Sequence, residues 1–417
     1  MFAMREPAEG RTGVLFVNAP TLPPLGADTW VHVQIIHHLD RTRFAPVVGC
    51  AVGRPDEPSP YFAALRDGAD IEIVPIDLGP ELSTSASRGR VRTILATLPA
   101  LTSFVRLARL VRSRGIEIIH TSDRPRDAAF CVLLARVTRT RCIVHVHVGY
   151  GEWMSRILKW ALRRADALVA ISAFVAETLV ESGHDPSRMH VVLNSIDTDR
   201  WVPGNGRAEI RTELGIGPDE PVVLAVCRLF EAKGVRELIQ AVPAMRDERP
   251  DVRVLVVGRE MQQGLRQELE ELADALGVGD SVTFVGQRSD VPRFMAAADI
   301  YAMPSQWEPF GLVFAEAMAM KLPVVALDNG GTPEVVVHGV TGLLSPLGNA
   351  EALTVNLRAL LKDPARRTDM GERGRVRVLE HFGLARMARD VERVYDDITG
   401  QSLTERGIDG HGEAAHV

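Results

Sequence analysis

The chain has 417 residues, of which 46% are hydrophobic and 24% charged, and its formal net charge is −6. This composition is ordinary for a soluble globular protein with room for two full-sized domains. No apolar run reaches the roughly 18 residues that a membrane-spanning helix needs, and the first ten residues lack the basic-then-apolar order of a signal peptide. None of the four cysteines has CxxC spacing, so we expect buried thiols and a cytoplasmic location.

Short apolar runs rich in β-branched residues alternate with helical stretches along the chain. Such runs are typical of parallel strands that are buried on both faces. In the first half they begin at Gly13, Ala45, Ile71, Ile116, Arg141, Ala165 and Met189. In the second half they begin at Pro221, Val252, Ser281, Ala298, Leu322 and Thr341. Thirteen strands are too many for one compact sheet, so we expect an α/β protein with two Rossmann-like, doubly wound domains.

The polar, glycine-containing stretch Asp197–Arg211 predicts the join between these domains. We therefore assign residues 1–200 to a first domain and residues 201–383 to a second. Residues 384–399 carry apolar side chains along one side, which predicts an amphipathic helix that crosses back toward the first domain. For the polar tail 400–417 we expect no fixed structure.

A basic segment, residues 88–164, holds 16 Lys and Arg against four Asp and Glu, a net charge of +12. It is either an ordinary solvated face or a surface that attracts anions such as phosphates, acidic lipid headgroups or nucleic acid. Within it, residues 102–115 (TSFVRLARLVRSRG) mix apolar and arginine side chains in the manner of a peripheral amphipathic helix. A core-facing helix with a solvated arginine face fits the same pattern.

Candidate binding residues follow the strands of the second domain, where open α/β sheets bind their ligands. Arg228 and Lys233 lie together in the stretch CRLFEAKG after the first of these strands. A cation after a strand is often only a surface residue. Two cations in one strand-end loop, with glycine-rich turns nearby, favour a phosphate site.

The stretch EPFGLVFAEAMA adds two carboxylates around a predicted helix start at Phe310–Leu312. The first N–H groups of a helix lack intrahelical partners and can hold a phosphate. Glu308 lies just before this start, and Glu316 lies up to about 12 Å further along by helical rise. This span suits an extended sugar nucleotide. Glu308 alone also fits a charge that stabilises the helix dipole, whereas Glu316 sits in an apolar pattern and needs partners.

Together these residues resemble the retaining glycosyltransferases of family 4 (glycosyl transferases group 1), which have the GT-B architecture of two Rossmann-like domains facing a central cleft. The E-x7-E pattern of that family is present as Glu308 and Glu316, and its donor-phosphate pair as Arg228 and Lys233. The resemblance covers nearly the whole chain and is strongest over residues 222–344.

The resemblance implies transfer of a sugar from a nucleotide-diphosphate donor to an acceptor hydroxyl, with retained anomeric configuration. It implies no cofactor and no divalent metal, because cations and the helix start would neutralise the departing diphosphate. The catalytic positions that it implies are Glu308, on the donor sugar, and His147, beside the acceptor. The donor-binding positions that it implies are Gly26, Arg228, Lys233, Gln287, Phe310, Gly311, Leu312 and Glu316.

Two of these positions, Glu316 and Gln287, extend the site beyond the phosphate contacts. The resemblance places Glu316 on the ribose and the backbone near Gln287 at the base. Gly26 is what remains of the usual glycine pair after the first strand, since Ala27 follows it. His145 shares a strand face with His147, so an H-x-H metal site is formally open, but the sequence offers no obvious third ligand and we expect no metal.

Three other classes of protein are weaker interpretations. An NAD-dependent oxidoreductase would need a GxGxxG sequence opening a helix, and none follows a strand here. Nucleic-acid binding through the basic segment lacks stacking aromatic residues. A non-catalytic GT-B protein that binds a sugar nucleotide or a partner remains the alternative. The expected partners are a nucleotide sugar and a small-molecule, glycan or lipid acceptor, with peripheral contact at the inner membrane face left open.

Overall fold

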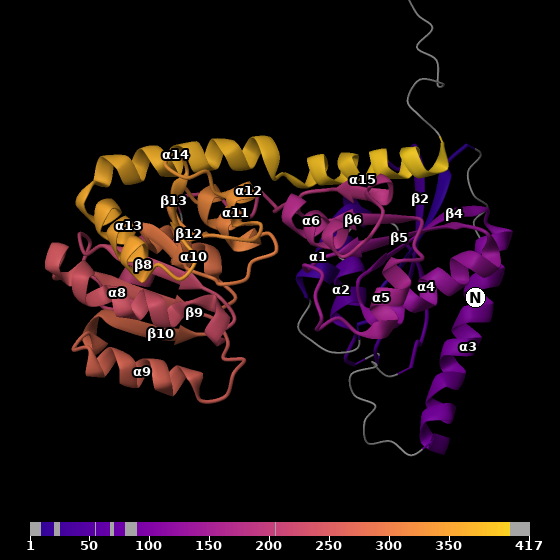
Figure 1. The fold of residues 1–417 in the computed structure, drawn as a ribbon, viewed down its shortest axis with the longest axis horizontal. Helices are drawn as coiled ribbons and strands as arrows, with labels where there is room; N and C mark the ends of the chain where they lie inside the picture. Colours follow the sequence, from indigo (N-terminus) through magenta and orange to yellow (C-terminus); the bar gives the residue numbers. More distant parts are fainter. Residues whose placement is uncertain are drawn as a thin grey trace, which may run out of the picture.

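The computed structural model describes residues 10–20, 26–54, 56–66, 71–79, 90–204 and 206–400, and within these the side chains of all but residues 90–97. The expectation for the tail beyond Gly400 lies outside the described residues. Figure 1 shows two α/β bodies side by side, each a sheet with helices on both faces. The two-domain architecture predicted from the thirteen apolar runs is confirmed.

The first sheet contains seven parallel strands in the order β3-β2-β1-β4-β5-β6-β7. The strands are β1 (Thr12–Val17), β2 (Phe44–Cys50), β3 (Glu72–Pro75), β4 (Ile116–Ser122), β5 (Arg141–Val146), β6 (Ala167–Ala170) and β7 (Met189–Val191). The central strands are buried along almost their whole length, because helices cover both faces. The strand order reverses beside β1, as in doubly wound folds.

The second sheet contains six parallel strands in the order β10-β9-β8-β11-β12-β13. The strands are β8 (Val222–Val226), β9 (Arg253–Val257), β10 (Val282–Gly286), β11 (Ile300–Met303), β12 (Val324–Asp328) and β13 (Gly342–Pro346). Its order also reverses, between β8 and β11. The loops that follow these two strands therefore lie at a topological switch point, where such sheets bind ligands.

The described helices lie in the connections between strands, except for the last three, which follow β13. In the first domain they are α1 (Ala27–His38), α2 (Pro60–Arg66), α3 (Arg90–Ser113), α4 (Pro125–Thr138), α5 (Arg156–Leu162) and α6 (Ala173–Glu181). From residue 207 onward they are α7 (Arg207–Glu213), α8 (Val235–Glu248), α9 (Leu265–Ala275), α10 (Val291–Ala297), α11 (Leu312–Ala319), α12 (Thr332–Val335), α13 (Ala350–Lys362), α14 (Pro364–His381) and α15 (Leu384–Thr399). None of these helices is long and apolar enough to cross a membrane.

The last two helices bridge the domains. In Figure 1 the yellow helices α14 and α15 run end to end along the top, α14 over the second domain and α15 over the first. The apolar side of α15 packs into the core of the first domain, on the sheet face that α1 also covers. Its polar side is held by Arg43, which binds Asp396 at 2.7 Å and Glu392 at 3.5 Å. The amphipathic helix predicted from the sequence is confirmed.

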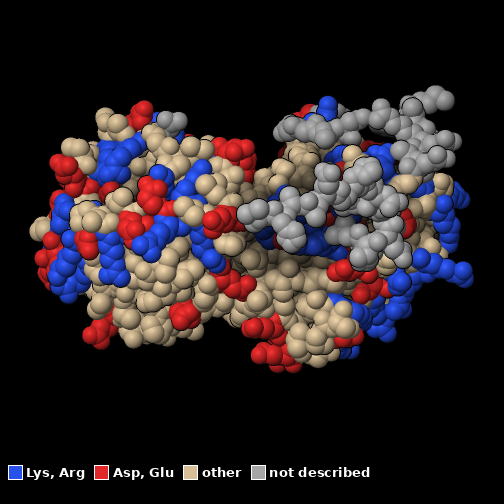
Figure 2. Space-filling view, turned by 90° about the horizontal axis from the view of Figure 1, so that it is seen from above, with Lys and Arg blue, Asp and Glu red and all other residues tan. Residues whose placement is uncertain are grey.

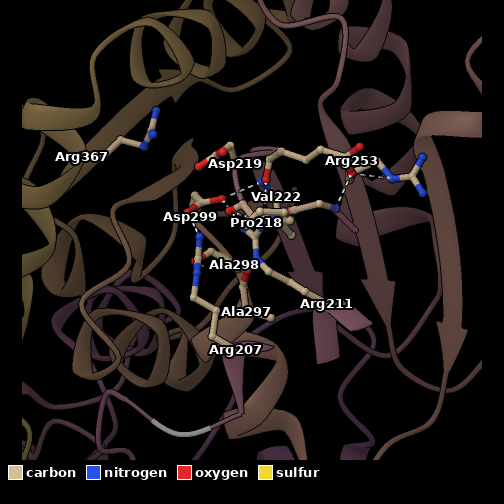
Figure 3. Close-up of polar contacts among 12 residues, drawn as sticks. Arg207, Arg211, Pro218, Asp219, Val222, Arg253, Ala297, Ala298, Asp299 and Arg367 are labelled. Carbon is tan, nitrogen blue, oxygen red and sulfur yellow. Dashed lines mark hydrogen bonds and ion pairs between the residues drawn. The ribbon is translucent and has the colours of Figure 1, made fainter. Parts of the chain in front are cut away.

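Helix α7 follows the join and is fixed to the second domain by an arginine–aspartate cluster (Figure 3). Arg207 and Arg211 each donate to one carboxylate oxygen of Asp299, at 2.8 and 2.9 Å. Asp299 also accepts the backbone N–H of Val222, the first residue of β8. Because this cluster lies at the amino ends of β8 and β11, it stabilises the edge opposite the candidate site.

The cysteines behave as the sequence predicts. Cys50, Cys131, Cys142 and Cys227 are all buried and free. Burial raises the pKa of the Cys227 thiol to about 11, so this side chain stays protonated at neutral pH.

Candidate active site

Two of the predicted site residues, Lys233 and Glu308, meet where β8 and β11 end. Lys233, in the loop after β8, donates to Glu308, in the loop after β11, with 2.8 Å between Nζ and Oε2. Both side chains are largely shielded, with 14% and 12% of their surface exposed. The backbone N–H of Gln306 donates to the carbonyl of Ala232 at 2.8 Å and fastens the two loops together. The fold therefore holds the Lys233–Glu308 pair in place at this edge of the sheet.

The helix start predicted at residues 310–312 is present, since α11 begins at Leu312. Gly311 caps it with a φ of +97°, and a Cβ there would lie 2.3 Å from the ring of Phe314. Only glycine fits this position without strain. Phe310 is buried, which anchors the turn from the inside. The free N–H groups of the first turn of α11 thus face the same edge as the Lys233–Glu308 pair.

Two glycines after β12, Gly330 and Gly331, pack against the backbone of the turn that precedes α11. The N–H of Gly331 donates to the carbonyl of Glu308 at 2.8 Å. A Cβ at Gly330 would lie 2.4 Å from that same carbonyl oxygen, and one at Gly331 would lie 2.3 Å from the carbonyl oxygen of Pro309. The sequence NGG after β12 is therefore required for the close approach of two strand-end loops.

Glu316 is half-buried in α11, and its carboxylate makes no hydrogen bond or ion pair within the described part of the chain. Burial raises the pKa of Glu316 to about 7, and the charge of Arg200 acts in the opposite direction. A shielded carboxylate without partners is costly unless a ligand supplies donors. This geometry is consistent with the ribose-binding role that the resemblance implies.

The shifted Glu316 pKa predicts a pH-dependent stability difference between wild type and Glu316→Gln. A carboxyl whose pKa is higher in the folded state stabilises the fold below its unfolded pKa, and this contribution is lost as the pH rises through about 7. Between pH 5 and pH 8 the wild type should therefore lose about 2 kcal/mol of unfolding free energy relative to Glu316→Gln. Urea unfolding of both proteins at the two pH values measures this. Parallel curves would contradict the shifted pKa.

The remaining predicted donor contacts are more exposed. Arg228 lies just after β8, exposed, with its guanidinium 6.0 Å from the centre of the Phe230 ring. Lys233 lies 5.6 Å from the same ring, so both cations flank one aromatic side chain. Gln287 is exposed after the edge strand β10. The structure therefore brings Arg228 and Lys233 together, whereas Gln287 lies two strands away from β8.

The first domain contributes His147, directly after β5. Its backbone N–H donates to Asp123 at 2.9 Å. Burial lowers the pKa of His147 to about 4, although the nearby Asp28 carboxylate acts to raise it, so the imidazole is neutral at pH 7. Burial raises the pKa of Asp123 to about 7. Asp28 is in turn bound to Arg124 at 2.8 Å.

Asp28, Asp123 and Arg124, the charged neighbours of His147, were not among the residues predicted from the sequence. Asp123 and Arg124 directly follow β4, the strand beside β5, so the strand-end rule could have found them. Gly26 caps α1, and a Cβ there would lie 2.4 Å from a carboxylate oxygen of Asp28. Gly26 therefore has a local packing role here, and the five residues before it lie outside the described structure.

The carboxyl edges of the two sheets touch at the candidate site. Ser172, after β6, donates its hydroxyl to the carbonyl of Pro309 at 2.7 Å. The N–H groups of Ala173 and Phe174 at the start of α6 donate to the carboxylate of Glu334 at 2.7 and 2.8 Å. Glu334 belongs to α12 of the second domain. No local pattern in the sequence marks this interdomain pairing, which places the His147 strand end near the Glu308 turn.

Two wound parallel-sheet domains whose carboxyl edges face each other are the architecture of the GT-B glycosyltransferases. Residues 206–377 match the family model described as glycosyl transferases group 1, and residues 62–200 match that of glycosyltransferase family 4. The chain therefore belongs to the group 1 glycosyltransferases and is an enzyme of sugar transfer.

Similar proteins illustrate the range of this family. A GDP-mannose-dependent phosphatidylinositol monomannoside mannosyltransferase of Mycolicibacterium smegmatis is 31% identical over 300 residues, 68% of this chain and 78% of that protein. A D-inositol 3-phosphate glycosyltransferase of Mycobacterium sp. is 43% identical over 185 residues, 43% of this chain and 41% of that protein. The crystal structure of Anabaena HepE with UDP and glucose superposes with a TM-score of 0.75 at 22% identity, covering 93% of this chain and all of HepE. The oxidoreductase interpretation is thereby excluded.

Proposed function

We propose that this enzyme transfers a sugar from a nucleoside-diphosphate donor to an acceptor hydroxyl with retention of anomeric configuration. The observation that carries the proposal is the Lys233–Glu308 pair, 2.8 Å apart, beside the glycine-capped start of α11. A cation and free helix N–H groups suit a diphosphate, and a carboxylate beside them suits sugar hydroxyls. Glu308 holds the donor sugar, and the unpartnered Glu316 holds the ribose.

The proposed reaction needs no divalent metal at the diphosphate. As the sugar–phosphate bond breaks, negative charge develops on the leaving diphosphate. Arg228, Lys233 and the first-turn N–H groups of α11 are arranged to stabilise that charge. His147 lies after β5 at the edge of the first sheet that meets the second domain, where an acceptor can approach the sugar. Its neutral imidazole can accept a hydrogen bond from an acceptor hydroxyl.

A thermal-shift screen tests whether the site binds nucleoside diphosphates. The similar mannosyltransferase is named for GDP-mannose, and HepE was solved with UDP, so the screen should include GDP, UDP and ADP with their monophosphates. A ligand at 100 times its Kd adds about 2.7 kcal/mol of stability. We expect one diphosphate to raise the Tm without added divalent cation, and its monophosphate to act more weakly. Equal response to the monophosphate would contradict a diphosphate site.

A basic and apolar surface on the first domain suits an anionic membrane or a lipid-linked acceptor. Helices α3 and α4 pack side by side. The large apolar side chains exposed on them are Leu98, Leu101, Val105, Leu133 and Val137. The arginines exposed on and just after them are Arg106, Arg109, Arg112, Arg136 and Arg139. Figure 2 shows blue basic side chains gathered along the outer end of this domain, away from the second domain.

We expect this surface to bind anionic vesicles at low salt, because buried apolar side chains and arginines near acidic headgroups act together. The double variant Leu101→Glu/Val105→Glu should lower the vesicle-bound fraction about tenfold in cosedimentation. Val376→Glu is the matched control, since Val376 is an exposed apolar residue on α14 of the second domain. Wild-type protein that stays in the supernatant at low salt would reject the membrane proposal and leave a soluble acceptor.

A further inference from the structure

Four histidines from three elements gather under the carboxyl edge of the first sheet. His32 comes from α1, His120 from β4, and His145 from β5, with His147 just beyond β5. In the register of the sheet His145 lies opposite Ser122, so His120 and His145 point to the same face. The ring centre of His32 lies 4.9 Å from the ring centre of His120 and 5.5 Å from that of His145. His32, His120 and His145 are 25 to 113 positions apart in sequence, so only folding brings them together.

The ring nitrogens of this cluster are strongly under-bonded. Of the eight, seven are buried with no hydrogen-bond partner in the described part of the structure, and the exception is Nδ1 of His120. His32, His120 and His145 are fully buried. Buried polar atoms nearly always have a partner, and each one left without a partner destabilises the fold. Seven such atoms in one place therefore point to a missing common partner.

We propose that His32, His120 and His145 bind a transition-metal ion, with Zn²⁺ the best fit. One ligand nitrogen from each of the three lies within 4.8 Å of the others. Tetrahedral zinc with Zn–N distances of about 2.0–2.1 Å places its nitrogens about 3.4 Å apart. Small side-chain rotations close that difference. A water supplies the fourth ligand.

The surroundings of His120 have the form of a supported metal ligand. Its Nδ1 lies 2.7 Å from the hydroxyl of Tyr395 on α15. Donation from Nδ1–H to that oxygen fixes the tautomer and leaves the Nε2 lone pair for a metal, the arrangement that usually orients metal-bound histidines.

The ion would have a structural role in the first domain and would not take part in binding the diphosphate. It would tie α1 and β4 to β5, and through Tyr395 it would also engage the helix that bridges the domains. The strand that ends in His147 would be held in place by this link. The proposed diphosphate contacts lie in the other domain, so the chemistry there stays independent of added metal.

The test measures metal content and coordination without using activity. Protein made without a histidine tag is stripped with a strong chelator, reloaded with Zn²⁺, desalted and analysed by elemental mass spectrometry. We expect one zinc per chain in the wild type, and less than about one tenth in His145→Gln and in His32→Gln. His184→Gln should keep one zinc, because His184 is a buried histidine of the same domain that lies outside the cluster. Retention of one zinc by both cluster variants would overturn the proposal.

A second measurement needs only the wild type, in case the variants fail to fold. Stripped protein is titrated with Co²⁺, which absorbs strongly in the visible range when its coordination is tetrahedral. We expect such a spectrum to saturate at one equivalent, together with a rise in Tm that a chelator reverses. Folded wild-type protein with no tetrahedral spectrum and no retained zinc would show that internal waters, not a metal, satisfy the histidines.

Discussion

Glu308→Gln is expected to lower kcat by about 100-fold or more, which corresponds to about 2.7 kcal/mol of lost transition-state stabilisation. The carboxylate is shielded, is held by Lys233 at 2.8 Å, and lies beside the start of α11. There it can orient the sugar while positive charge develops at the anomeric carbon. Glutamine keeps the volume and the hydrogen bonding but removes the charge. Glu316→Gln should instead raise the donor KM more than it lowers kcat, because ribose contacts are remote from the breaking bond.

Steady-state kinetics on folded protein, checked by circular dichroism, measure this effect. The matched control is Glu248→Gln in α8. Glu248 is as shielded as Glu308, at 13% exposed, and is ion-paired with Lys362 at 2.7 Å. If the loss came only from breaking a shielded ion pair, the two variants would behave alike. Full kcat in folded Glu308→Gln would reduce Glu308 to a charge at a helix start.

Arg228→Ala and Lys233→Ala should each weaken binding of the preferred nucleoside diphosphate about 10- to 100-fold. Charge-assisted hydrogen bonds are worth roughly 1.5–3 kcal/mol, and 1.4 kcal/mol is a factor of ten in affinity. The larger loss is expected for Lys233, because its removal also leaves the shielded Glu308 carboxylate facing the diphosphate without a counter-ion. Arg228 is exposed and should fall at the lower end.

Titration calorimetry at fixed ionic strength measures these affinities. Arg246→Ala is the control, since Arg246 is ion-paired with Asp280 at 3.0 Å at the far end of α8 in the same domain. Its affinity should match the wild type, which separates a local contact from a general loss of positive charge. Unchanged binding in both strand-end variants would refute the phosphate site.

Local patterns predicted the fold well because each strand and helix has its own signal. The apolar runs predicted all thirteen strands, and the Gly311 turn predicted the start of α11. The single apolar stripe of residues 384–399 gave α15. Parallel strands buried on both faces need such continuous runs, so few other sequences fit the role. Strand-end reasoning also brought Arg228 and Lys233 together.

Contacts between distant segments could not be read in the same way. The pairing of Glu334 with the start of α6 joins residues about 160 positions apart, and nothing local in either segment marks the other. The histidine cluster shows the same limit. His145 and His147 suggested an H-x-H pair, but His32 and His120, which the proposed zinc site also needs, lie on other elements and became visible only in the fold. The expectation of no metal was drawn from the residues of one strand, and it stays a prediction that the zinc measurement tests.

The proposed sugar transfer from a nucleoside-diphosphate donor is tested most directly by release of nucleoside diphosphate from sugar nucleotides. UDP- and GDP-linked sugars are incubated with wild type and Glu308→Gln, with and without candidate acceptors, and the free diphosphate is measured by chromatography. We expect release from donors of one base by the wild type, faster with an acceptor, and at least about 100-fold slower release by Glu308→Gln. Wild-type protein that binds the diphosphate but releases none from any matching sugar donor, with or without acceptor, would contradict sugar transfer from a nucleoside-diphosphate donor.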